Sequence, residues 1–340
     1  MRIIRAEHMG WCFGVRDAVV LVSRQAEERP VTVLGELVHN ETVNAALRAQ
    51  GVQLTSRLDE VATDTVVITA HGASETTLRR VRERAGQVVE ATCPLVHAAH
   101  RAVRELVAAG FHPVIVGRRD HVEVRGLTED LAEFDVVLKE EDVARLAPRA
   151  RFGVAAQTTQ PVERVQRIVE SIRQRFPHAE VRFADTVCRP TKDRQTAAVE
   201  LAKQCDAVVV IGGRNSNNTN ELAQTCARYC ERVVRAETAA DLRVEWFEGA
   251  ETVGITAGTS TPDVVIDGVE RWLNELAEER NESESTSKSK VCSELRSGVA
   301  VRPVTALRWR CVPHYERGCS RRHHLIRLRG RVGDTSDWRC

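Results

Sequence analysis

A chain of 340 residues is too long for one typical hydrophobic core, so two or three domains are expected. The composition, 42% hydrophobic and 29% charged, is that of a globular protein, and no apolar run approaches the roughly 20 residues that cross a bilayer. Because the start lacks the apolar stretch of a signal peptide, we expect a cytoplasmic protein with no membrane partner. In that compartment ten cysteines favour metal binding or catalysis over disulfides.

Short runs of β-branched residues alternate with amphipathic stretches through the first 280 residues. In chain order, the predicted strands are Val31–Leu34, Thr65–Thr69, Pro113–Val116, Phe152–Ala155, Ala207–Ile211 and Thr252–Thr256. Predicted helices follow several of them, at Ser74–Ala85, Val162–Phe176 and Asn220–Cys230. This alternation indicates α/β units with parallel sheets, whose ligands gather at the carboxyl ends of the strands.

Charge divides the chain into two kinds of polypeptide. Residues 281–340 hold 13 Lys and Arg against 6 Asp and Glu, so the totals of 49 and 48 leave 36 basic and 42 acidic residues in 1–280. Because 278–290 is rich in Ser, Glu and Lys, we predict a disordered linker and basic tail at 278–340. One solitary cysteine in each third of the rest predicts three small α/β domains in a pseudo-threefold arrangement, at 1–95, 96–190 and 191–277.

Cys12, Cys93 and Cys188 are the three solitary cysteines, and each stands in a turn-like sequence. A lone buried cysteine is ordinarily a small hydrophobic residue, but Cys12 and Cys93 lie beside Gly or Pro in polar turns, where packing does not require a thiol. Three thiolates brought together by a fold can hold an iron–sulfur cube and leave one iron without a protein ligand. Zinc accepts thiolates equally well, and the spacing leaves the metal open.

Polar side chains recur just beyond the predicted strands. His39, His71 and His121 occupy comparable places there, which favours anion binding or proton relay over three solvated surface histidines. Glu123 follows His121 by two residues; in an extended segment both side chains would share one face, where the carboxyl could store protons. An ordinary surface carboxylate is the alternative.

Two loops that open predicted helices are rich in Gly, Ser, Thr and Asn, at 212–220 and 256–263. Free N–H groups at a helix start, together with such side chains, can bind a phosphate or diphosphate. Plain N-capping by Ser and Asn is the alternative. Neither loop is a Walker loop, because the Gly-Lys-Ser/Thr ending is missing.

The order of these motifs resembles the IspH/LytB family, the 4-hydroxy-3-methylbut-2-enyl diphosphate reductases. The resemblance covers roughly residues 2–275 and includes Cys188 in addition to eight short motifs. These are Gly-Trp-Cys-Phe-Gly-Val at 10–15, Leu-Val-His-Asn at 37–40, Ala-His-Gly at 70–72, Ala-Thr-Cys-Pro-Leu-Val at 91–96, His-Val-Glu-Val at 121–124, Gln-Thr-Thr at 157–159, Asn-Ser-Asn-Asn at 215–218 and Thr-Ala-Gly-Thr-Ser at 256–260.

The resemblance implies a trefoil of three α/β domains around one central [4Fe–4S] cluster with an open iron. Its three ligands would be Cys12, Cys93 and Cys188. Catalysis would fall to Glu123 as proton donor, to Thr158 as the residue that orients the substrate hydroxyl, and to His121. The residues expected to bind the substrate are His39, His71, His121, Thr158, Ser216, Asn217, Asn218 and Ser260.

The implied reaction is the reductive dehydroxylation of (E)-4-hydroxy-3-methylbut-2-enyl diphosphate to isopentenyl and dimethylallyl diphosphate, the last step of the non-mevalonate isoprenoid pathway. A ferredoxin or flavodoxin would supply the electrons. The sequence departs from the family pattern at 117–120, Val122, Arg125 and Ala98. Two alternatives stay open: a paralogous [4Fe–4S] reductase or dehydratase for another small anion, and a cluster-bearing regulator that binds nucleic acid through its basic tail.

Overall fold

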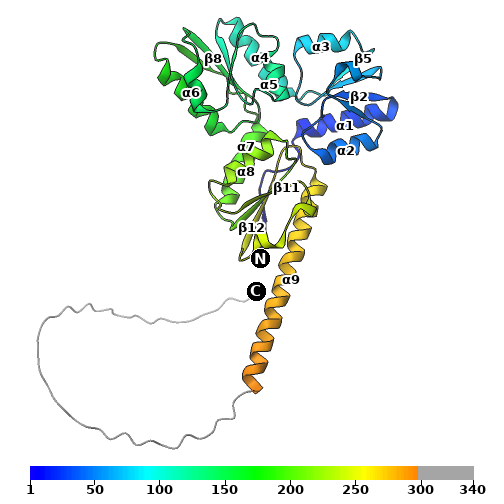
Figure 1. The fold of residues 1–340 in the computed structure, drawn as a ribbon, viewed down its shortest axis with the longest axis vertical. Helices are drawn as coiled ribbons and strands as arrows, with labels where there is room; N and C mark the ends of the chain where they lie inside the picture. The colour runs from blue at the N-terminus through cyan, green and yellow to red at the C-terminus, as the bar shows by residue number, and fades with distance from the viewer. Residues whose placement is uncertain (298–340) are drawn as a thin grey trace, which may run out of the picture. The chain divides into compact units, whose positions relative to one another are not determined.

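The computed structural model describes residues 1–297, and this part of the chain contains three parallel sheets of four strands each (Figure 1). The sheets form three lobes within one compact unit, Met1–Lys288. The α/β fold class predicted from the sequence is confirmed. No helix in the described part has the length and apolar content that spanning a membrane requires.

The strand order is the same in all three sheets if β1 is counted as the last strand of the third sheet. The first and third strands of each sheet then lie at its centre, and the second and fourth lie at its edges. The first sheet has the order β3 (Gln53–Thr55), β2 (Val31–Leu34), β4 (Thr65–Ile68), β5 (Gln87–Glu90). The second has the order β7 (Asp135–Val137), β6 (His112–Val116), β8 (Arg151–Ala156), β9 (Glu180–Phe183). The third has the order β11 (Val233–Ala236), β10 (Ala207–Ile211), β12 (Thr252–Ala257), β1 (Arg2–Arg5).

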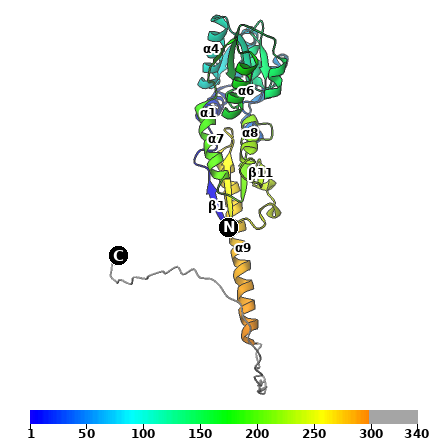
Figure 2. The same cartoon turned by 90° about the vertical axis from the view of Figure 1, so that its left-hand side faces the viewer.

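The start of the chain therefore completes the last sheet. β1 pairs in parallel with β12 from Arg2 opposite Thr252 to Arg5 opposite Ile255 (Figure 2). In this place β1 is the equivalent of β5 and β9, the fourth strands of the other two sheets. The predicted domain boundaries at 95 and 190 stay a prediction, because the lobes belong to one compact unit that β1 closes.

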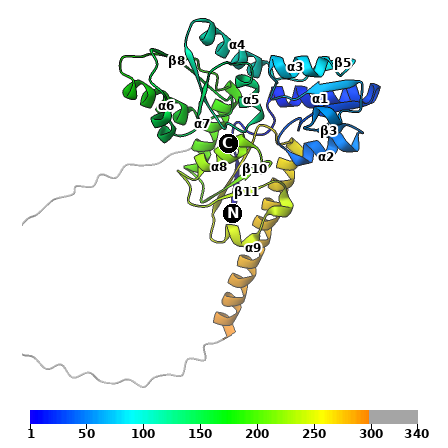
Figure 3. The ribbon, with the colours of Figure 1, turned by 45° about the horizontal axis from the view of Figure 1, so that its top comes forward.

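Helices cover both faces of every sheet, again in one repeated pattern. In the first lobe α1 (Phe13–Glu28) and α2 (Glu41–Ala49) pack on one face and α3 (Glu75–Arg82) on the other. The second lobe has α4 (Pro94–Ala108) and α5 (Val122–Thr128) opposite α6 (Val162–Arg175). In the third lobe α7 (Arg189–Ala202) and α8 (Asn217–Cys226) lie on one side of β10 and β11, and α9 (Asp263–Ser297) lies on the other side (Figure 3).

Helix α9 extends over the first part of the predicted linker, as far as Ser297. The basic tail beyond it, at 298–340, lies outside the described residues.

Each solitary cysteine lies on a connection between two lobes. Cys12 follows β1 of the third lobe and precedes α1 of the first, and it is the N-cap residue of that helix. Cys93 is the N-cap residue of α4, between β5 and the second lobe, and Cys188 is the N-cap residue of α7, between β9 and the third lobe. The repeated topology thus places the three cysteines at equivalent joints.

Candidate functional site

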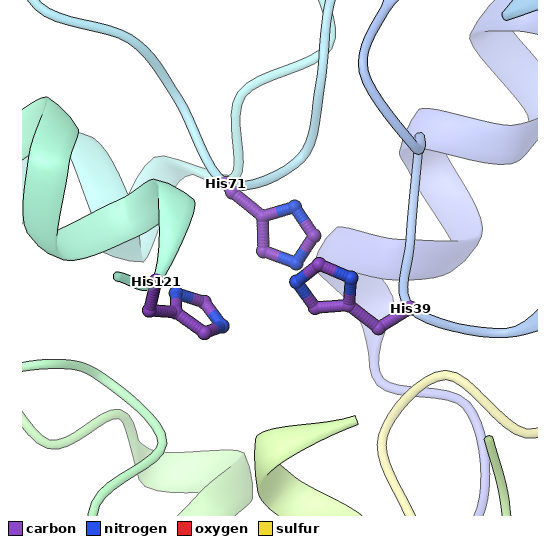
Figure 4. A group of neighbouring side chains, drawn as sticks. All are labelled: His39, His71 and His121. Atoms are coloured by element: carbon purple, nitrogen blue, oxygen red, sulfur yellow. The ribbon is translucent and has the colours of Figure 1, made fainter. Parts of the chain in front are cut away.

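Three histidine rings meet where the first and second lobes face each other (Figure 4). His39 follows β2, His71 follows β4, and His121 is the N-cap residue of α5. The ring centroids lie 4.4 Å apart for His39 and His71, 5.1 Å for His39 and His121, and 5.5 Å for His71 and His121. One ring nitrogen from each lies within 4.8 Å of the other two. The three histidines therefore lie together, with His39 and His71 stacked and His121 edge-on to both, and their joint role stays a prediction.

Burial keeps two of these rings neutral near pH 7. It lowers the pKa of His71 well below its usual value, and the neighbouring His39 and His121 lower it further. Burial also lowers the pKa of His121 to about 3. Unlike these two, His39 has an acidic partner, with its Nδ1 2.9 Å from Oε2 of Glu36. The group therefore presents two neutral rings and, in His39, a ring that contacts a carboxylate.

The hydrogen bonds of the rings suit an anion better than a cation. The backbone N–H of Glu123 donates to Nδ1 of His121 at 3.2 Å, so the neutral His121 ring carries its proton on Nε2. Nδ1 of His71 is buried and has no partner among the described residues. A metal ion requires an unprotonated nitrogen, whereas the oxygens of a diphosphate accept from N–H donors.

Glu123 is a buried carboxyl group, with 1% of its surface exposed, and it lies in the first turn of α5. The segment is helical from Val122 onward, so the extended geometry considered for His121 and Glu123 does not apply. The backbone N–H of Thr158 donates to Oε1 of Glu123 at 2.7 Å. Burial raises the pKa of Glu123 to about 7, although the hydrogen bonds from Thr158 oppose this shift. The carboxyl group can therefore hold or release a proton near neutral pH.

The loop before α8 uses its side chains in two ways. Oγ of Ser216 accepts from the backbone N–H of Thr219 at 3.3 Å. This is an N-capping bond, which the sequence analysis gave as the alternative to anion binding. Oδ1 of Asn218 accepts from the backbone N–H of Thr259 at 3.0 Å, whereas its Nδ2 is buried without a partner in the described part of the chain. A buried amide donor without a partner is costly, so the site has a free donor for an acceptor group.

Contacts between lobes bring the remaining polar residues to the same place. Nδ2 of Asn217 donates to Oγ1 of Thr159, beside Thr158, at 3.3 Å. Oγ of Ser260 donates to the backbone oxygen of His39 at 3.4 Å. The predicted substrate-binding residues therefore come from all three lobes and surround one region, although their roles stay a prediction.

Two further residues shape this region: the sequence analysis did not single out Glu36, and it named Gly213 only within the loop 212–220. Glu36, the partner of His39, has no local signal beyond its spacing of three residues. Gly213 lies so close to the first lobe that a Cβ there would stand 2.4 Å from the backbone oxygen of His39. Only a glycine allows this approach. The Gly-Gly pair after β10 is consistent with a close contact, but the sequence does not show that the partner is the loop of His39.

A cavity of about 730 Å³ lies between the first and second lobes. His39, Gly72, Val122 and Arg125 contribute to its wall. His39 therefore borders a space large enough for a small organic anion. Arg125, a departure from the family pattern, adds positive charge to this wall.

The three solitary cysteines are free thiols at the starts of helices. None of their side chains makes a capping hydrogen bond, and each is half-buried. Burial raises the pKa of Cys93, and the charges of Cys12 and Glu123 raise it further. Burial likewise raises the pKa of Cys188 to about 11, with Glu123 and Cys12 again among the causes. Gly14, two residues after Cys12, lies so close to Cys93 that a Cβ there would stand 2.4 Å from its Sγ, so the start of α1 lies beside Cys93.

Cys12, Cys93 and Cys188 offer three thiols from three connections between lobes. Thiolates are the ligands that iron–sulfur clusters use, so the chemistry of this donor set fits such a cluster.

Comparisons with known proteins point to one family. The family model of the LytB protein matches residues 3–274. The 4-hydroxy-3-methylbut-2-enyl diphosphate reductase of Geobacter metallireducens is 38% identical over 279 residues, which cover 81% of this chain and 98% of that relative. The reductase of the same name from Neisseria meningitidis is 36% identical over 312 residues, with 88% and 97% covered.

Solved structures show the same relationship. The E-1-hydroxy-2-methyl-but-2-enyl-4-diphosphate reductase of Plasmodium falciparum aligns with a TM-score of 0.74 at 25% identity, over 80% of this chain and 87% of that one. A structure of (E)-4-hydroxy-3-methyl-but-2-enyl diphosphate reductase aligns with a TM-score of 0.59 at 36% identity, over 81% of this chain and 100% of that one. The resemblance carried by the motifs is thus confirmed, and this chain belongs to the LytB family.

Proposed function

We propose that this chain is an iron–sulfur reductase that removes the hydroxyl group of (E)-4-hydroxy-3-methylbut-2-enyl diphosphate. The products would be isopentenyl and dimethylallyl diphosphate, with water as the leaving product. Relatives at 35–39% identity are named 4-hydroxy-3-methylbut-2-enyl diphosphate reductase. The observation that supports the proposal most directly is the position of Glu123, a buried carboxyl next to the histidine group and hydrogen-bonded to the loop of Thr158.

The LytB family carries an iron–sulfur cluster. In this chain we assign a [4Fe–4S] cluster to Cys12, Cys93 and Cys188, with one iron left without a protein ligand. When bound, such a cluster supplies electrons one at a time and a Lewis-acidic iron for the substrate oxygen. The N-cap positions support this assignment, because the N–H groups of the first turns of α1, α4 and α7 favour negative charge at the thiolates.

The diphosphate would bind to the polar side chains that the three lobes bring together. His39 and His121 offer ring N–H groups, and Nδ2 of Asn218 offers a buried donor that has no other partner among the described residues. Binding one end of the substrate in this way fixes the hydroxyl at the other end, which removes much of the entropic cost of the reaction. Ser216, Asn217 and Ser260 would complete the pocket.

Glu123 would deliver the protons. The overall reaction takes up two electrons and two protons: one proton leaves with the hydroxyl group as water, and the other bonds to carbon at either end of the allyl unit. With a pKa of about 7, Glu123 holds a proton in a large fraction of molecules at neutral pH and can take up a new proton after donating one. Thr158, whose N–H binds Glu123, would orient the carboxyl and the substrate hydroxyl.

The electrons would come from a ferredoxin or a flavodoxin. Phe13, directly after Cys12, is 46% exposed at the start of α1 and offers an apolar contact beside a cluster ligand. Small electron carriers form weak, transient interfaces, for which a small exposed patch of this kind suffices.

Anaerobic purification followed by iron, sulfide and activity measurements tests the proposal. We expect about four irons and four sulfides per chain for a [4Fe–4S] cluster, and turnover of the C5 hydroxy-diphosphate with a reduced carrier. Replacing any one of the three cysteines by Ser should abolish the cluster, whereas Cys226→Ser should not, because Cys226 is buried among aliphatic residues of the third lobe. A normal cluster without turnover would favour the paralogue with another small anionic substrate.

A further inference from the structure

Arg194 is a charged residue in the protein interior. It lies on α7, six residues after Cys188, with 6% of its surface exposed. Its three hydrogen bonds within the described residues go to backbone carbonyl groups. Nε and Nη2 donate to the oxygen of Gly10 at 3.1 and 2.6 Å, and Nη1 donates to the oxygen of Pro190 at 2.9 Å.

These bonds tie the loop of Cys12 to the helix of Cys188. Gly10 has a φ of +71°, and a Cβ there would stand 2.7 Å from Ile266, so a glycine is required for this turn. The loop also binds the connection that follows β12, where the N–H of Cys12 donates to the oxygen of Thr259 at 3.2 Å. Arg194 therefore helps to set the position of Cys12 relative to Cys188.

The charge of Arg194 has no carboxylate partner. No Asp or Glu oxygen of the described residues lies within 4.0 Å of its guanidinium, and neighbouring Asp193 instead pairs with Arg189 at 2.6 Å. Burial lowers the pKa of Arg194, whereas the negative charges of Cys12, Cys188 and, more weakly, Asp193 raise it. Because an uncompensated buried charge is strongly destabilising, the thiolates are its natural counter-ions.

We propose that Arg194 is a positioning residue for the cluster and supplies the positive charge that compensates it. The inference rests on the cluster assigned under the proposed function. Reduction adds one negative charge to the cluster, and a fixed positive charge in a poorly solvated site favours the reduced form. Arg194 should therefore raise the reduction potential and slow the loss of iron.

Two substitutions separate the charge from the geometry. Arg194→Gln removes the charge, and Arg194→Lys keeps it but cannot donate two bonds to one carbonyl. Arg189→Gln is the matched control: it removes a charge from the same helix, next to Cys188, but its side chain is 82% exposed and solvent screens it. The measurements are the midpoint potential by redox titration followed with EPR, and the rate of iron loss to a chelator.

We expect a more negative midpoint potential in Arg194→Gln, a nearly unchanged one in Arg194→Lys, and no change in Arg189→Gln. Iron loss should be faster in both Arg194 variants, by about tenfold in the Gln variant, the lower end of what lost supporting contacts cost metal sites. Wild-type potential and wild-type iron retention in Arg194→Gln would overturn the inference. So would an equal shift in Arg189→Gln, because the effect would then come from net charge alone.

Folding and the cluster itself are controlled separately. If Arg194→Gln misfolds by circular dichroism, Arg194→Lys decides, and wild-type iron retention in that variant would contradict the positioning role. If the wild-type protein itself binds no iron, the proposed function fails. If it binds iron and reduces the substrate but the Arg194 variants behave like wild type, only the inference about Arg194 fails.

Discussion

Glu123 shows how the environment of one side chain can set the pH range of a reaction. The same carboxyl on the surface would be ionised at neutral pH, with a pKa near its ordinary value of 4.5. Burial at 1% exposure penalises the charged form and raises the pKa to about 7, and the N–H of Thr158 limits the shift by binding the carboxylate. A group of this kind can be the acid in one step and be reprotonated before the next.

The first prediction concerns the pH dependence of turnover. Because Glu123 must be protonated to donate, and its folded pKa is about 7, kcat/KM should fall about tenfold per pH unit above neutral pH. Glu123→Gln should keep the cluster absorbance and substrate binding but lose about 10²–10⁴-fold in turnover. A pH profile of both proteins between pH 6 and 9 checks this, and Glu123→Asp, which keeps a carboxyl, should retain the alkaline decline. Undiminished turnover in Glu123→Gln would remove Glu123 from its assigned role.

At the scale of the element, the strands divide into two classes. The six predicted strands correspond to β2, β4, β6, β8, β10 and β12, which are the two central strands of every sheet. Helices cover them on both faces, so β4 and β10 are buried along their whole length and read as continuous apolar runs. The edge strands escaped prediction because they are partly exposed: β1 and β5 both begin and end with an exposed residue.

The helix starts carry the cysteines, and the contact between two of these starts gives the second prediction. A Cβ on Gly14, in the first turn of α1, would stand 2.4 Å from Sγ of Cys93 at the start of α4. Gly14→Ala should therefore displace Cys93 and lower the iron content, with overpacking costing about 1–3 kcal/mol of stability. Iron analysis and thermal unfolding check this.

Gly268→Ala is the matched control for Gly14→Ala. Gly268 lies in α9, and a Cβ there would meet nothing within 4 Å. This variant should keep its full iron content. Normal iron in Gly14→Ala as well would mean that Cys93 can move aside without losing a cluster.

At the scale of the whole molecule, the lobes are held together by buried polar contacts. Arg164 on α6 of the second lobe and Glu221 on α8 of the third form an ion pair at 2.6 Å, with side-chain exposures of 17% and 8%. Their helices follow the loops of Thr158 and Ser216, so this pair joins two sides of the candidate site.

The third prediction is that this ion pair stabilises the assembly of lobes. Arg164→Gln leaves the buried Glu221 carboxylate without its charged partner and should cost about 3 kcal/mol of unfolding free energy. Arg167→Gln is the control, since Arg167 on the same helix pairs with Glu140 and both are 47% exposed; it should cost less than about 1 kcal/mol. Denaturant unfolding followed by circular dichroism measures both. An equal loss of unfolding free energy in both variants would show that the ion pair between the lobes stabilises the protein no more than an exposed pair does.

The amino-acid sequence by itself determined the α/β class, the central strands and the motifs that mark the family. These are local properties: burial on both faces produces apolar runs, and the site residues stand in short loops directly after strands. Glu123 and the histidines could be named for the same reason, although the sequence could not show that His121 begins a helix.

Only the tertiary structure decided what depends on residues distant in the chain. β1 completes the third sheet across about 250 residues of sequence, and that closure makes the joint of Cys12 equivalent to those of Cys93 and Cys188. The raised pKa of Glu123 and the carbonyl partners of Arg194 likewise require the packed molecule. Desolvation and long-range contacts are properties of the folded chain, and no local stretch of residues encodes them.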